Sequence, residues 1–127
     1  MSDDIKFTKL DDYLLVNIQN KIITLDRAQE ILARIGKECA NIKCNKVLLD
    51  EMSVQRRDIP PKDIENLALD SVNNNLNKVY MAFLCQPHLI DYDSNMLSLY
   101  TSIYEFITHH FSNKEEAIAW LKKKHNN

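Results

Sequence analysis

The segment Lys46-Val47-Leu48-Leu49-Asp50 is a short apolar run that ends in an acidic residue. Its three apolar residues follow one another without polar alternation, which is typical of a strand that is buried on both faces of a parallel sheet. The aspartate then marks the end of the apolar run. We therefore predict a central parallel strand over residues 46–50, with its carboxyl end meeting solvent.

Two further apolar runs lie on either side of this stretch in the sequence. They are Tyr13-Leu14-Leu15-Val16-Asn17-Ile18 and Val79-Tyr80-Met81-Ala82-Phe83-Leu84-Cys85. Because helical segments separate the three runs, we expect them to lie side by side and to point the same way in the middle of the molecule.

The edges of the predicted sheet carry weaker patterns. Residues 5–10 alternate only in part, and Asp11-Asp12 suits a tight turn before the strand at 13–18. This pair is predicted to be antiparallel, with residues 5–10 at the edge. A very short strand at about 107–111 completes a sheet of about five strands.

Four helices are predicted to cover this sheet. Thr24 offers an N-cap oxygen to the first helix, Pro61 suits the first turn of the second, and Asp93 or Ser94 caps the third. Residues 51–60 are predicted as a loop. The last helix follows Ser112-Asn113-Lys114-Glu115, which matches the capping box S-x-x-E.

Gly36 and the cysteines add three packing predictions. Gly36, the only glycine, costs the first helix about 1 kcal/mol relative to alanine, so we expect another backbone to come close there. Cys39 and Cys85 are predicted to be small core residues. Cys44, in a polar connection, is predicted to be a solvent-accessible thiol.

Length and composition limit the class of protein. The chain has 127 residues, and 16 basic against 18 acidic residues give a net charge of −2. We expect one domain over 1–127, with its core at about 5–124. No basic field for nucleic acid is present, and no apolar run approaches the roughly 20 residues of a membrane-spanning helix. Three cysteines without C-x-x-C and without a signal peptide predict a cytoplasmic protein.

The C-terminal segment of the chain reads Phe111-Ser112-Asn113-Lys114-Glu115-Glu116-Ala117-Ile118-Ala119-Trp120-Leu121. It resembles the F-x-(D/N)-x-E-E-A-x-x-W-L terminus of SpoIIAA-like proteins. These are small bacterial single-domain proteins of STAS/SEC14 type, and residues 47–50 resemble their central strand. The resemblance implies an α/β, STAS-like fold with a mostly parallel sheet. It implies little about activity, because most small members of the group have none assigned.

One departure from the family bears on regulation. The anti-sigma-factor antagonists of this fold carry a D-S-S-G-type segment after the central strand, with a phosphorylated serine at a helix N-terminus. The corresponding residues 57–62 contain no Ser, Thr or Gly. We therefore expect the phosphorylation switch to be absent, and Ser53, at the end of the strand rather than at the helix start, is the one nearby hydroxyl that could be phosphorylated.

Candidate site residues gather in the segment after the central strand, where open α/β sheets bind ligands. Asp50, Glu51, Asp58 and Asp63 could serve as acid and base or hold a divalent ion. The favoured interpretation is that Asp50 accepts loop amides and that the other carboxylates are solvated.

The basic and imidazole pairs have equally plain interpretations. Arg56 and Arg57 could contact a phosphate or a partner carboxylate, but a solvated pair beside Asp58 is favoured. His109 and His110 are adjacent in a strand and therefore point to opposite faces, which argues against a shared metal site. We expect no metal, and without G-x-G-x-x-G or a Walker loop we expect no cofactor.

Residues 96–107 form the widest apolar surface in the sequence. Two helical stripes adjoin there, Leu97, Tyr100, Tyr104 and Ile107 beside Met96, Leu99, Ile103 and Phe106. Such a helix is buried on more than one side, or it covers an apolar ligand or partner. Packing within the domain, a homodimer surface and a lipid-like pocket all remain open.

Three hypotheses about function follow. The preferred one is a non-enzymatic regulatory or protein-interaction module that binds a protein partner, or a second copy of itself, through the sheet edge or the third helix. The second is a small binder of an apolar or lipid-like ligand. The third is a hydrolase-type enzyme that uses the Asp50–Asp63 loop.

Overall fold

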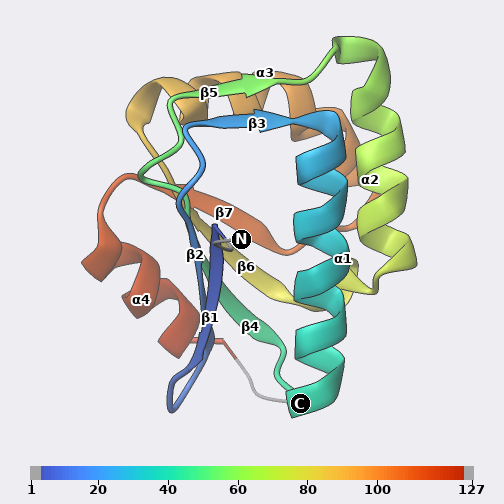
Figure 1. The fold of residues 1–127 in the computed structure, drawn as a ribbon. Helices are drawn as coiled ribbons and strands as arrows, with labels where there is room; N and C mark the ends of the chain where they lie inside the picture. The colour runs from blue at the N-terminus through green and yellow to red at the C-terminus, as the bar shows by residue number, and fades with distance from the viewer. Residues whose placement is uncertain (1–3, 125–127) are drawn as a thin grey trace.

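A computed structural model describes residues 4–124, apart from the side chains of residues 97–99 and 101. Its main sheet has the strand order β1-β2-β4-β6-β7 (Figure 1). The strands are β1 (Ile5–Lys9), β2 (Leu14–Ile18), β4 (Lys46–Asp50), β6 (Tyr80–Leu84) and β7 (Thr108–Phe111). β1 pairs antiparallel with β2, and every other pair is parallel. The predicted mixed sheet, its antiparallel edge and its central strand at 46–50 are confirmed.

The helices cover both faces of this sheet. They are α1 (Leu25–Ile42), α2 (Ile64–Asn73), α3 (Pro87–Tyr104) and α4 (Lys114–Lys122), with 3-10 turns η1 (Pro61–Asp63) and η2 (Leu76–Lys78). α1 and α2 run side by side, and α4 lies on the other side of the sheet (Figure 1).

The two faces have separate cores. Val47, Leu49 and Met81 pack with residues of α1, α2 and α3, whereas Leu48 and Ala82 pack with α4. β4 is therefore buried on both faces, as its uninterrupted apolar sequence predicts.

Two helix starts differ from the predictions. α3 begins at Pro87, where Leu89 N and Ile90 N both donate to Gln86 O, so Asp93 lies inside the helix and caps nothing. In α4 the N-cap is Asn113, whose side chain accepts from Glu116 N at 3.0 Å. The predicted capping box beginning at Ser112 is thus wrong by one residue, because Asn113 is as good an N-cap as serine.

A second, two-stranded parallel sheet joins β3 (Ile22–Thr24) and β5 (Arg56–Asp58). The prediction of a loop over 51–60 is wrong for residues 56–58. This short strand is formed by backbone pairing rather than by an apolar pattern, since Gln55 N and Arg56 N both donate to Lys21 O at 2.7 and 3.2 Å. The pairing fixes the backbone on both sides of Arg57.

The packing predictions are mostly confirmed. A Cβ atom at Gly36 would lie 2.7 Å from the carbonyl oxygen of Asn74, so the end of α2 does approach this glycine. Cys39 and Cys85 are buried, and burial raises the pKa of each thiol to about 12. Cys44 is half-buried, and its thiol donates to Lys46 O at 3.3 Å, so it is less accessible than a fully exposed thiol.

No helix in the described part of the chain combines the length and the apolar character needed to cross a membrane.

Candidate functional site

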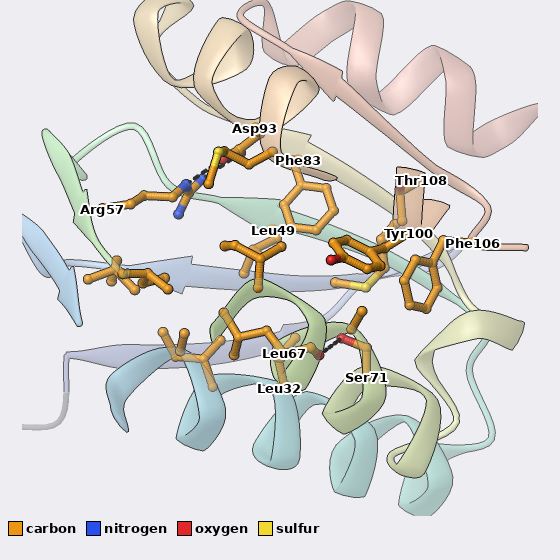
Figure 2. A pocket seen from close by; sticks show the side chains of 18 of the residues that line it. Leu32, Leu49, Arg57, Leu67, Ser71, Phe83, Asp93, Tyr100, Phe106 and Thr108 are labelled. Carbon is orange, nitrogen blue, oxygen red and sulfur yellow. Dashed lines mark hydrogen bonds and ion pairs between the residues drawn. The ribbon is translucent and has the colours of Figure 1, made fainter. Parts of the chain in front are cut away.

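A cavity of about 150 Å³ lies between the sheet and the three helices on one of its faces (Figure 2). Side chains in a strand alternate between the two faces, so Leu49 of β4 and Met81 and Phe83 of β6 all face this cavity. Leu32 of α1 and Leu67 of α2 line it from the opposite side. The wall is apolar over most of its area, because every one of these elements presents its buried stripe to the same space.

Aromatic side chains line one end of the cavity. Figure 2 shows Tyr100 of α3 beside Phe106, close to Thr108 of β7. α3 ends at Tyr104, and Glu105 follows with a left-handed backbone (φ 58°). This residue redirects the chain after the helix, so that Phe106 reaches the cavity before β7 begins.

The other end of the cavity is polar and is centred on Arg57, as Figure 2 shows. Its Nη1 and Nη2 atoms donate to Glu51 at 3.0 and 2.9 Å, and its Nε and Nη2 atoms donate to Asp93 at 2.8 and 3.0 Å. The side chains of Glu51 and Asp93 are each 4% exposed and that of Arg57 is 10% exposed. A buried guanidinium thus holds two carboxylates, each through two hydrogen bonds.

His110 of β7 extends this polar end. Its Nε2 atom lies 3.1 Å from Asp93 Oδ2, which is an ion-pair distance when the ring is protonated. The geometry does not allow a hydrogen bond, and the buried Nε2 atom has no hydrogen-bond partner. The imidazole stacks on the ring of Phe83, with centroids 4.7 Å apart and an 11° angle between the planes. We name Glu51, Arg57, Asp93 and His110 the polar cluster.

Arg57 and Asp93 stabilise each other's charged forms. Burial alone lowers the pKa of Arg57, but the charges of Glu51 and Asp93 outweigh it and raise that pKa. Burial alone raises the pKa of Asp93, but His110 and Arg57 outweigh it and lower that pKa. We attribute most of this lowering to Arg57, since only Arg57 donates well-aligned hydrogen bonds to Asp93.

The structure separates the carboxylates that the sequence grouped together. Asp50 accepts from Met52 N at 3.1 Å and from Asn17 Nδ2 at 3.3 Å, and it does not line the cavity. Asp58 is exposed and Asp63 is half-buried. Glu51 alone faces the cavity, so the expectation that it is solvated is wrong.

The remaining candidates also divide into cavity and surface residues. The expectation of a solvated arginine pair is wrong for Arg57, whereas Arg56 and Ser53 are exposed. Tyr100 lines the cavity, but Tyr104 is half-buried outside it, with its ring centroid 6.0 Å from that of Phe106. The side chain of Leu97 lies outside those that the structure describes.

Sequence reasoning missed Asp93 and His110 as members of this site. Asp93 lies on the same helical stripe as Met96 and Tyr100, at spacings of three and four residues. A carboxylate on an otherwise apolar stripe is the feature of the sequence that could have indicated its place in the site. His110 carried a weaker signal, since alternation in a strand tells that His109 and His110 diverge but not which one is covered.

Over the described residues, no group of three or more His, Cys, Asp or Glu side chains is placed to hold a metal ion.

Comparison with known proteins identifies the fold. No protein-family model and no curated protein matches the sequence. Among solved structures, the chain is similar to an uncharacterized protein of the DUF3478 family with a SpoIIAA-like fold, from Shewanella loihica PV-4. The TM-score is 0.55 and the identity is 16%, over 95% of this chain and 98% of that one. The predicted SpoIIAA-like fold is confirmed, and at this identity the likeness concerns the fold alone.

Proposed function

We propose that this SpoIIAA-like chain is a STAS-like binding module that takes up a small, mostly apolar molecule between its sheet and α1–α3. One observation carries the proposal, namely the cavity of about 150 Å³ with apolar walls and a polar cluster at one end. Ligand sites in proteins commonly combine mostly apolar walls with a few polar groups that fix the orientation of the ligand.

The volume limits the size of this ligand. An apolar cavity of about 150 Å³ binds molecules such as benzene, whereas drug-sized ligands occupy roughly 300–1,000 Å³. The molecule therefore has one ring or a short chain, rather than the long acyl chains of a whole lipid. The hypothesis of a lipid-like ligand is therefore restricted to small apolar molecules.

The other two hypotheses have less geometric support. A hydrolase that uses the Asp50–Asp63 loop needs converging carboxylates, and Asp50 bonds its own loop while Asp58 is exposed. A protein-interaction module, with a protein partner or a second copy of the chain, stays a prediction. The large apolar side chains exposed on the described part of the chain belong to five separate segments, at Leu10, Ile22, Met52, Leu69 and Ile103.

A matched pair of variants on α1 tests the proposal. Ala28 lines the cavity, whereas Ala33 is exposed on the same helix. Toluene is titrated into ¹⁵N-labelled protein, and the amide signals of Leu49, Phe83 and Tyr100 are followed by NMR. We expect toluene to shift these signals in the wild type and in Ala33→Leu, but not in Ala28→Leu, because the added side chain fills the cavity.

Two results would contradict the proposal. The first is a wild-type protein whose cavity signals do not respond to toluene. The second is a folded Ala28→Leu variant, verified by circular dichroism, that binds toluene as well as Ala33→Leu does.

A further inference from the structure

The hydrogen-bond donors of Arg57 are almost all occupied. A guanidinium has five N–H donors, and four of them bond Glu51 and Asp93. A ligand carboxylate that binds arginine in the usual forked geometry needs two parallel N–H groups. Arg57 can offer these only by giving up a buried carboxylate of the protein. The one arginine of the cavity is therefore not a receptor for an acidic head group.

The net charge of the polar cluster also disfavours an acidic head group. Two carboxylates and one guanidinium leave a net charge of −1 when His110 is uncharged, and zero when it is protonated. Among the described residues that line the cavity, no other is a lysine, arginine, aspartate or glutamate. Neither state of His110 makes this end of the cavity positive, so a buried anionic ligand would remain uncompensated.

The carboxylates of Glu51 and Asp93, in contrast, can still accept further hydrogen bonds. Each carboxylate offers about four lone-pair sites, and each of the oxygen atoms of Glu51 and Asp93 accepts one hydrogen bond from Arg57. A group that donates hydrogen bonds can use the remaining sites without breaking the existing pairs.

We propose that the cavity selects an apolar molecule whose head group is an amine or a hydroxyl, and that it discriminates against carboxylic acids of the same size. This inference rests on the proposed function and adds the chemical class of the ligand. The apolar body fills the space between Leu49 and Tyr100, and the donor group points to Glu51 and Asp93.

Four probes with the same ring test this selectivity in the wild-type protein. They are toluene, benzyl alcohol, benzylamine and benzoate, titrated by NMR with the amides of Phe83 and Tyr100 as reporters. We expect benzylamine and benzyl alcohol to bind more tightly than toluene, and benzylamine to bind at least about tenfold more tightly than benzoate, since a buried carboxylate would lack a cation that is not already paired.

The possible results separate this inference from the proposed function. If toluene binds and benzoate binds as tightly as benzylamine, the inference on the head group is wrong and the apolar site stands. If none of the four probes shifts the cavity signals, the proposed function fails and the inference fails with it.

A matched pair of variants on α3 tests the origin of the selectivity. Asp93 belongs to the polar cluster, whereas Asp91 is exposed two residues earlier on the same helix. Both substitutions, Asp93→Asn and Asp91→Asn, remove one negative charge from the protein. We expect the preference for benzylamine over benzoate to fall several-fold in Asp93→Asn and to stay unchanged in Asp91→Asn.

Equal preferences in the two variants would show that the overall charge of the protein, and not the polar cluster, sets the selectivity. If Asp93→Asn does not fold, the ranking of the four probes in the wild type decides the question alone.

Discussion

Arg57 is buried among apolar side chains because Glu51 and Asp93 compensate the cost of removing its charge from water. Its neighbour Arg56 is exposed on the same three-residue strand. Two adjacent arginines thus occupy opposite environments. No pattern in the sequence distinguishes them, because the pairing of β5 with β3 decides which one faces inward.

We predict that Arg57→Met destabilises the protein by about 3–5 kcal/mol, because it leaves two buried carboxylates without their partner. The free energy of unfolding is measured by urea denaturation. Arg56→Met is the control and is expected to change it by less than about 0.5 kcal/mol. Similar losses for the two variants would mean that Arg57 is not a buried ion-pair partner.

Asp93 predicts a dependence of stability on pH. Its pKa in the folded protein is lowered from the ordinary value of 3.8. Its contribution to stability is therefore complete well above pH 3.8 and is lost as the pH falls through the folded-state pKa. We expect urea midpoints to fall between pH 5 and pH 3, and to fall less in Asp93→Asn than in Asp91→Asn. If the urea midpoint of Asp93→Asn falls with pH as much as that of Asp91→Asn, Asp93 is not the group responsible.

Among the helices and strands, the strands with uninterrupted apolar sequences were predictable. The apolar runs at 13–18, 46–50 and 79–85 contain β2, β4 and β6, which pair in parallel in one sheet, because burial on both faces requires such sequences. The strands β3 and β5 were not predictable, since a three-residue strand such as Arg56–Asp58 has no periodicity to detect.

Gly36 joins two helices at close range. A Cβ atom there would lie 2.7 Å from Asn74 O and 2.9 Å from Asn74 Cβ. We predict that Gly36→Ala destabilises the protein by about 1–3 kcal/mol, although alanine is the better helix former, because α1 and the end of α2 must move apart. Lys37→Ala, at an exposed position of α1, is the control for urea unfolding. A more stable Gly36→Ala protein would show that the close approach is absent.

The start of α4 carries an N-cap whose contribution can be measured. Asn113 caps the helix, and Ser112 lies one residue before it. We predict that Asn113→Ala costs about 1 kcal/mol in unfolding experiments and that Ser112→Ala costs far less. The reverse order would restore the capping box that the sequence suggested.

The cavity could not be predicted from the sequence. Its walls come from both sheets and from α1, α2 and α3, which are brought together only by the complete fold. The sequence did indicate an excess of apolar residues at 96–107, and Tyr100 and Phe106 do line the cavity. It could not decide between core, interface and pocket, because periodicity describes one helix at a time.

Because the cavity joins so many elements, a ligand in it should stabilise the entire fold. We predict that toluene at ten times its dissociation constant raises the free energy of unfolding by about 1.4 kcal/mol. The measurement is urea denaturation with and without toluene, and Ala28→Leu should show no increase. An equal increase in that variant would mean that toluene acts elsewhere.

The alternation along β4 has a consequence for how this sequence can change in length. Val47 and Leu49 belong to one core and Leu48 belongs to the other. Deleting or inserting a single residue within 46–50 would exchange the side chains of the two layers along part of the strand, and both layers would lose their fit at once. Homologues that differ in length should therefore carry their insertions in the connections between elements, and the spacing within this strand should be constant.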